Sequence, residues 1–204
     1  AKRFDPIEYP KPDGVLSFVV SLPWATHPGW AETRAFHEAV DARLAALPGV
    51  ASHGRAGGLP VPGAPWGGAT LRVEGEETDG ALPTYNWGHV SVGYLETLRI
   101  PLLSGRLFAA PDLAEYGHPV MVVNEAFARR HWAGPEGAVG RRVHRGSQVW
   151  EIVGVVGNTA GDGTWGDPSA PLAYVPAVFS PWHLRDAVYV LRTDLPPTRL
   201  AAEV

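Results

Sequence analysis

The run of residues 120–132 constrains the fold of this sequence most, because it specifies a strand, a helix cap and a helix in immediate succession. Its first four residues are uncharged and mostly β-branched, which is typical of a buried strand. Asn124 comes next, and its side chain is suited to cap a helix that begins at Glu125. The negative charge of Glu125 also suits the N-terminus of a helix. This run therefore predicts a strand that leads directly into a helix.

Residues 90–108 predict a short helix and then an extended segment. Ser91 is expected to cap the helix with its hydroxyl, while Val90 and Leu95 occupy the two positions of a hydrophobic staple. Pro101 ends the helix, because the residue before a proline is biased toward an extended backbone.

The first fifty-odd residues predict a strand–helix–strand unit. Strands are expected at residues 15–22 and 50–55, with a helix at residues 31–47 between them. One apolar face of the helix is expected to be buried, and it consists of Phe36, Ala39, Val40, Leu44 and Leu47. Such units usually place their two strands parallel, with a right-handed crossover.

Short strands are expected along the rest of the chain. A tight turn at residues 145–147 predicts a hairpin of residues 141–143 and 149–156. The other expected strands are residues 69–73, 82–90, 172–175 and 187–192. Residues 158–171 predict a polar, glycine-rich loop, and residues 198–204 predict the start of a helix.

Composition excludes several classes of protein. The 204 residues are 45% hydrophobic, which is enough to bury a core in one domain or in two small ones. The net charge is −4 and no basic run is present, so nucleic acid is not an expected partner. The absence of cysteine excludes disulfides and thiolate metal sites. No run is long enough for a transmembrane helix and residues 1–11 do not form a signal peptide, so we expect any targeting signal or membrane anchor to lie outside this segment.

The sequence predicts no metal site. Its histidines lack the paired spacing of metal ligands and are scattered at His27, His37, His53, His89, His118, His131, His144 and His183. His37 and Asp41 are one helical turn apart on an otherwise polar face, so they predict a solvated pair. Asp162 and Asp167 lie among glycines but lack the alternating acidic ligands of a calcium loop, so a surface loop is expected there.

Catalytic and cofactor sites are not predicted either. Gly154, Gly157 and Gly161 do not form a dinucleotide-binding pattern, and the nucleophile elbow and the phosphate-binding loop are absent from the sequence. Several tryptophans together would suit a sugar-binding platform, but here they are spread singly, which is typical of packing in a core or at its rim. They are Trp24, Trp30, Trp66, Trp87, Trp132, Trp150, Trp165 and Trp182.

Four segments together resemble a known family. They are V-S-V-G-Y-L-E-T-L-R-I-P-L-L-S-G-R-L-F at residues 90–108, P-V-M-V-V-N-E-A-F-A-R-R-H-W at 119–132, W-E-I-V-G-V-V-G-N at 150–158 and L-A-Y-V-P at 172–176. Their order and spacing resemble the extracytoplasmic core domain of MacB-like ABC transporter permeases, particularly the duplicated orphan permeases that lack a fused ATPase. The resemblance runs from about residue 15 to the C-terminus and is most specific over residues 90–176.

The resemblance implies an α+β fold, in which a porter-like strand–helix–strand subdomain carries an inserted, mostly β second subdomain. Residues 15–57 and 187–204 would form the first, residues 90–176 the second, and residues 58–89 and 177–186 would connect them. The two ends of the chain are therefore expected to share one sheet. In the family the helix corresponding to residues 198–204 continues into another strand, so the C-terminal part of the first subdomain is expected to be truncated.

The resemblance also implies a function. The expected role is that of a non-catalytic domain without cofactors, on the periplasmic face of the bacterial cytoplasmic membrane, which transmits ATP-driven motion to export or efflux. The expected partners are the transmembrane helices of the same full-length chain and a separate ABC ATPase subunit, with a second permease copy or a periplasmic protein beyond them. The alternatives are a ligand-sensing or carbohydrate-binding module and, behind it, a hydrolase of unrecognised type.

Two details of the family pattern predict local structure. Relatives commonly read V-S-P-G-Y-F-x-T-L-G-I-P, whereas this sequence has Val92, Leu95 and Arg99 in place of the proline, the phenylalanine and the second glycine. A left-handed backbone at Arg99 would cost about 1 kcal/mol. The run G-R-L-F-A-A-P-D resembles a family G-R-x-F…D pattern, so Arg106 is expected to hold the nearby loop with Asp112 as its partner.

Overall fold

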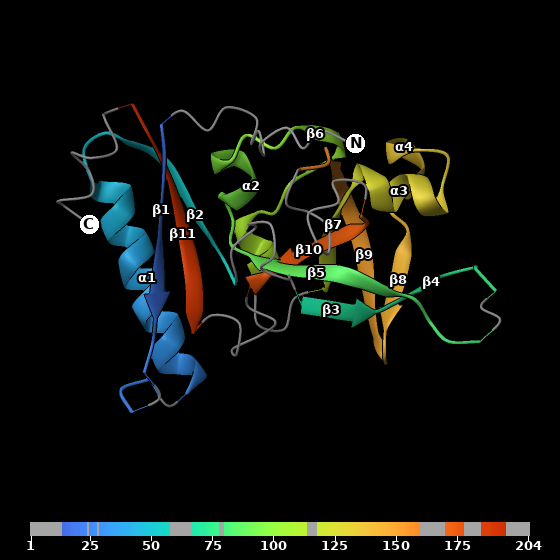
Figure 1. Cartoon of the computed structure of the whole chain (residues 1–204), viewed down its shortest axis with the longest axis horizontal. Coiled ribbons are helices and arrows are strands. Elements are labelled where there is room, and N and C mark those ends of the chain that lie inside the picture. The colour runs from blue at the N-terminus through green and yellow to red at the C-terminus, as the bar shows by residue number, and fades with distance from the viewer. Residues whose placement is uncertain are drawn as a thin grey trace, which may run out of the picture.

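The computed structural model describes residues 14–23, 25–27, 29–57, 67–77, 80–113, 118–159, 170–177 and 185–194. The longer helices and strands are β1 (Val15–Ser21), α1 (Trp30–Ala46), β2 (Val50–Ala56), β5 (Thr84–Val90), β7 (Val120–Asn124), α3 (Glu125–His131), β9 (Gln148–Val156), β10 (Leu172–Pro176) and β11 (Asp186–Thr193). The shorter ones are β3 (Gly67–Thr70), β4 (Arg72–Val73), α2 (Tyr94–Thr97), β6 (Leu102–Gly105), the 3-10 helix η1 (Ala110–Leu113), α4 (Pro135–Ala138) and β8 (Arg142–Arg145). This is a mixed α+β fold, as expected (Figure 1).

One side of the molecule, which we call the α1 half, consists of β1, β11, β2 and α1. β11 lies between β1 and β2 and is antiparallel to both, so β1 and β2 run parallel to each other. The prediction that the two ends of the chain share one sheet is confirmed, since Val15 pairs with Arg192 and Val20 with Ala187. α1 lies along one side of these strands (Figure 1).

The other side, which we call the α3 half, contains β3 to β10 with α2, α3 and α4. Its strands follow the order β5, β10, β7, β9, β8 and β4, while β3 pairs with β5 and β6 pairs with β9. The pairs β5–β10 and β7–β9 are parallel, and the other pairs are antiparallel. The predicted hairpin is confirmed as β8 and β9, with Gly146 at φ 58° in the turn between them.

Asn124 caps α3 as predicted, because its side chain accepts a hydrogen bond from Phe127 N at 3.0 Å. The same oxygen accepts from Leu172 N at 2.9 Å, and the amide nitrogen donates to Ala170 O at 2.9 Å. The cap therefore also holds the start of β10 beside β7.

Three buried clusters form the core. Under α3 and α4, one face of the sheet buries a cluster that includes Trp87, Met121, Phe127 and Trp150. On the opposite face, a second cluster surrounds Tyr94 and Leu95 of α2. It also contains Ala56 of β2 and Val190 of β11, so it includes residues of both halves. The third lies under α1 and consists of Leu44, Ala187, Tyr189 and Leu191.

The buried face of α1 agrees with the predicted one in part, since Leu44 is buried and Val40 and Leu47 pack partly buried against the same cluster. Its fully buried side chains are Thr33, His37 and Leu44, whereas Ala39 is exposed and Phe36 only half-buried. The additional buried residue His37 lies beside the hydroxyl of Tyr189 on the strand beneath.

Several predictions fall outside the described residues. They include the helix at residues 198–204, most of the loop at residues 158–171, and residues 58–66, 78–79 and 178–184 of the connecting segments. Within the part of the chain that the structure describes, no helix has both the length and the apolar character needed to cross a membrane.

Candidate functional site

The two halves of the sheet meet at a narrow joint. Between β2 and β5 the register contains a single pair, Ala56 with Val90. Backbone hydrogen bonds flank that pair, from Gly57 N to His89 O and from Ser91 N to Arg55 O, each 2.9 Å long. Within the described residues, this joint is where strands of the two halves pair.

Ser91 belongs to the joint and does not cap α2. Its hydroxyl accepts a hydrogen bond from Arg55 N at 2.9 Å and donates one to Val92 O at 3.0 Å. Gly93, in a left-handed conformation with φ 85°, is the N-cap residue of α2, and no side chain caps that helix. The predicted cap at Ser91 is wrong because a strand far away in the sequence occupies its hydroxyl.

α2 packs directly on β2 through two glycines. A methyl group on residue 54 would lie 2.6 Å from Tyr94 N, and one on residue 93 would lie 2.6 Å from His53 O. Both distances are shorter than real contacts of such a carbon, so only glycine allows this approach. On the neighbouring strand, Arg192 Nε donates to Thr97 O at 2.8 Å and holds the end of α2 against β11.

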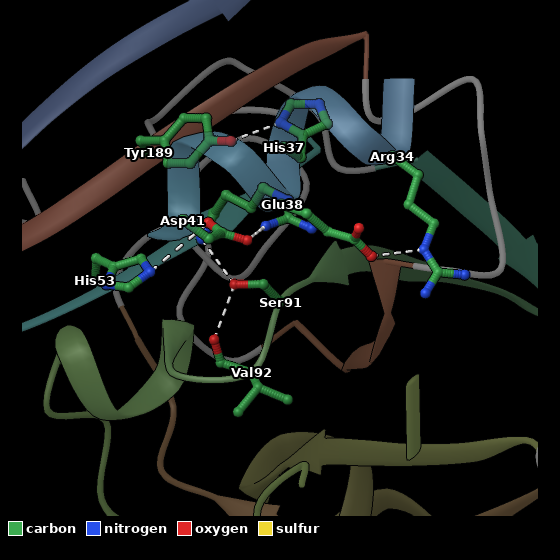
Figure 2. A network of polar contacts seen from close by, with 9 residues as sticks. Arg34, His37, Glu38, Asp41, His53, Ser91, Val92 and Tyr189 are labelled. Carbon is green, nitrogen blue, oxygen red and sulfur yellow. Dashed lines mark hydrogen bonds and ion pairs between the residues drawn. The ribbon is translucent and has the colours of Figure 1, made fainter. Parts of the chain in front are cut away.

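A polar network surrounds the joint on the side of α1 (Figure 2). Asp41 of α1 forms an ion pair with Arg55 of β2, and His53 Nε2 lies 3.7 Å from Asp41 Oδ1. Among the residues that the structure describes, the buried atoms Asp41 Oδ1 and Arg55 Nε have no hydrogen-bonding partner. The prediction of a solvated pair of His37 and Asp41 is therefore wrong, since Asp41 is paired with Arg55 and only half-exposed.

His37 is fully buried. Its Nδ1 lies 2.6 Å from the hydroxyl of Tyr189 of β11, and Figure 2 shows the two rings pointing toward one another. Burial raises the pKa of Tyr189 well above its ordinary value, so the phenol stays neutral at physiological pH. The contact between His37 and the neutral Tyr189 therefore holds α1 on the sheet.

Arg106 binds Asp112 as predicted. The guanidinium donates two hydrogen bonds to the carboxylate, at 2.6 and 3.0 Å, and Ala109 N donates a third at 2.8 Å. The hydrogen bonds from Arg106 lower the pKa of Asp112 below its ordinary value, against the effect of burial. These contacts fix the turn between β6 and η1, while Arg106 O lies against Gly154 of β9, where a side chain would not fit.

A further cluster joins the β4–β5 connection to α3, and the sequence analysis did not find it. His131 Nδ1 lies 2.8 Å from Glu76 Oε1, and His131 Nε2 lies 2.9 Å from the hydroxyl of Tyr85. Tyr85 is buried, and burial raises its pKa above the ordinary value of 10, so it is not an activated nucleophile. We therefore interpret this triad as structural.

The tryptophans that the structure describes do not line one open site. Trp87 and Trp150 are buried and pack edge to face at 5.2 Å between ring centroids, while the half-buried Trp30 and Trp132 lie apart, at the start of α1 and just after α3. Within the described part of the chain, no group of three histidine, aspartate or glutamate side chains is placed to hold a metal ion.

Comparison with known proteins identifies the family. Residues 17–202 match the MacB-like periplasmic core domain. The periplasmic region of MacB from Actinobacillus actinomycetemcomitans superimposes with a TM-score of 0.58 and 14% identity over 94% of this chain and 80% of that one. The extracellular domain of the noncanonic ABC-type transporter YknZ from Gram-positive bacteria gives a TM-score of 0.56 and 15% identity over 92% and 87%.

At these identities the two structures show a common fold. A comparison of the sequence with proteins of curated function finds no match. The match over residues 17–202 covers most of the chain, so the chain belongs to the family of MacB-like periplasmic core domains.

Proposed function

We propose that this domain is the extracytoplasmic part of an ABC transporter permease and transmits ATP-driven motion of the transmembrane helices to export or efflux outside the membrane. It acts without catalysis and without a cofactor. Its partners are the transmembrane helices of the same full-length chain and a separate ABC ATPase subunit. A second permease copy or a periplasmic protein is a further partner outside the membrane.

One observation carries the proposal. The described chain enters β1 and leaves β11 at the same end of the sheet, where Thr193 N donates to Gly14 O at 2.8 Å. Among the strands that the structure describes, the α3 half pairs with the α1 half only between β2 and β5. A displacement applied at residues 14 and 193 would therefore move the α1 half first and the α3 half through it, which is the arrangement of a transmitting element.

The test uses the full-length permease with its ATPase in lipid nanodiscs. Spin labels are placed on the exposed Glu136 of α4 and on the extracytoplasmic end of a transmembrane helix, and double electron–electron resonance gives their distance. We expect the distance to differ between the nucleotide-free and the ATP-bound, hydrolysis-deficient complexes. A distance that is the same in both states would overturn the proposal, as would undiminished export by a permease that lacks residues 15–194.

A further inference from the structure

We infer that α2 acts as a wedge that joins the α1 half and the α3 half into one rigid lever, so that the domain moves as a single body. The α2 wedge consists of residues 91–100. This inference rests on the proposed function, which explains why a rigid domain would be useful. Its evidence is the set of contacts within the domain.

The backbone of the sheet alone would make a hinge. Two half-sheets that share one register pair, Ala56 with Val90, have few hydrogen bonds to resist bending. Hinges generally are a few residues at the ends of elements that absorb changes in φ and ψ. Residues 56 and 90 occupy such positions, at the last residues of β2 and β5.

The α2 wedge removes that freedom by packing across the joint. Tyr94 and Leu95 are 1% exposed and belong to the same cluster as Ala56 and Val190, which come from the α1 half. Bending at the joint would separate these side chains and expose apolar surface to water, which is unfavourable. The wedge is thus part of the core of both halves.

Backbone contacts make the packing specific. Gly54 and Gly93 bring β2 and the start of α2 to a distance that no side chain allows. At the other end of α2, Arg192 of β11 donates to Thr97 O. Residue 99, just beyond, has φ 55°, a left-handed conformation that is strained for an arginine. Backbone hydrogen bonds from Arg99 N to Glu96 O and from Ile100 N to Leu95 O hold the chain in this conformation, at 2.9 and 3.0 Å.

The prediction concerns the distance between the halves in the working transporter. Exposed sites on α1 (Arg43→Cys) and on α4 (Glu136→Cys) provide a label pair across the joint, and this segment has no native cysteine. In the full-length permease with its ATPase, we expect one narrow distance distribution with the same mean in the nucleotide-free and ATP-bound states. A nucleotide-dependent change in this distance overturns the inference.

Two variants test the wedge itself. Gly54→Ala places a methyl group against the Tyr94 backbone, and Ser91→Ala, a milder change, removes the hydroxyl that accepts from Arg55 N and donates to Val92 O. We expect either variant to broaden the distance distribution between the halves and to lower export while ATP hydrolysis persists. Gly29→Ala is the matched control, because a methyl group there meets only the flexible end of Glu32.

The outcomes separate the two proposals. If the domain moves relative to the membrane while the distance between the halves also changes, the rigid lever is wrong and the proposed function stands. If the domain does not move relative to the membrane, the proposed function fails, whatever the distance between the halves. If Ser91→Ala and Gly54→Ala both leave the distribution narrow, the wedge does not hold the joint.

Discussion

At the scale of single residues, Asp112 shows how one buried carboxylate fixes a turn. Its side chain is 9% exposed and accepts hydrogen bonds from Arg106 and from Ala109 N. Removal of the guanidinium leaves this carboxylate with one donor in a partly buried place. Half of the Arg106 side chain is exposed, so solvent screens part of the interaction.

We expect Arg106→Ala to lower the free energy of unfolding by about 1 to 2 kcal/mol. The control is Arg129→Ala, because Arg129 pairs with Glu125 on an exposed face of α3 and should contribute less than 1 kcal/mol. Urea denaturation of both variants measures the difference. Equal effects would show that Arg106 does not fix the turn.

The Arg106–Asp112 pair also predicts that the stability of the domain depends on pH. The pKa of Asp112 is lowered in the folded protein from its ordinary 3.8, so its contribution to stability is complete above that value and is lost as the pH falls through the folded pKa. The difference in unfolding free energy between the native protein and Arg106→Ala should therefore stay constant from pH 7 to about 5 and shrink below about 4. A difference that persists unchanged at the lowest pH at which the protein folds would contradict this assignment.

His37 and Tyr189 predict a coupled pair. Tyr189→Phe removes the hydroxyl that lies 2.6 Å from Nδ1 of the buried His37, and should lower stability by about 1 to 2 kcal/mol. In a double-mutant cycle with His37→Leu, the double variant should lose less than the sum of the two single variants. Additive losses would mean that the hydrogen bond contributes nothing beyond packing.

At the scale of elements, Asn124 connects three of them. It caps α3, accepts from the first residue of β10 and donates to the residue before Pro171. Loss of an exposed helix cap typically costs about 1 kcal/mol. Here a second buried N–H, that of Leu172, would also lose its acceptor. We expect Asn124→Ala to cost about 2 to 4 kcal/mol in thermal or urea denaturation.

Asn124→Asp provides the matched comparison, because it keeps the acceptor oxygen and loses the donor to Ala170 O. It should be less destabilising than Asn124→Ala. If Asn124→Asp and Asn124→Ala lower the free energy of unfolding equally, the hydrogen bond donated to Ala170 O contributes more to stability than the cap.

The sequence predicted those elements whose signals are local. The β-branched run before Asn124 and the turn at Gly146 specify their strands through neighbouring residues, and both were confirmed. Ser91 and His37 were misassigned because their partners are distant: Arg55 N lies 36 residues away from Ser91, and Tyr189 lies 152 residues away from His37. A hydroxyl or an imidazole can form hydrogen bonds with many different partners, and the tertiary fold decides which partner is close enough.

At the scale of the whole molecule, the shared sheet was predicted, but the joint was not. Pairing of β1 with β11 follows from strand-like patterns at both ends of the chain. The packing of α2 on β2 depends on Gly54, because a side chain there would collide with the backbone of Tyr94. Nothing in the neighbouring sequence predicts this contact. The division into a porter-like subdomain at residues 15–57 and 187–204 and an inserted subdomain at residues 90–176 stays a proposal, and the common cluster around Tyr94 bears on how independent the two parts are.

The last prediction concerns cooperativity. Because Ala56 and Val190 of the α1 half share a buried cluster with Tyr94 and Val156 of the α3 half, neither half can unfold without exposing apolar surface of the other. Native-state amide hydrogen exchange should therefore give the same opening free energy for Val190 in β11 and for Ile152 in β9. Gly54→Ala should lower both values together. If β9 stays protected while β11 opens at a clearly lower free energy, the halves are separate cooperative units and the common core does not couple them.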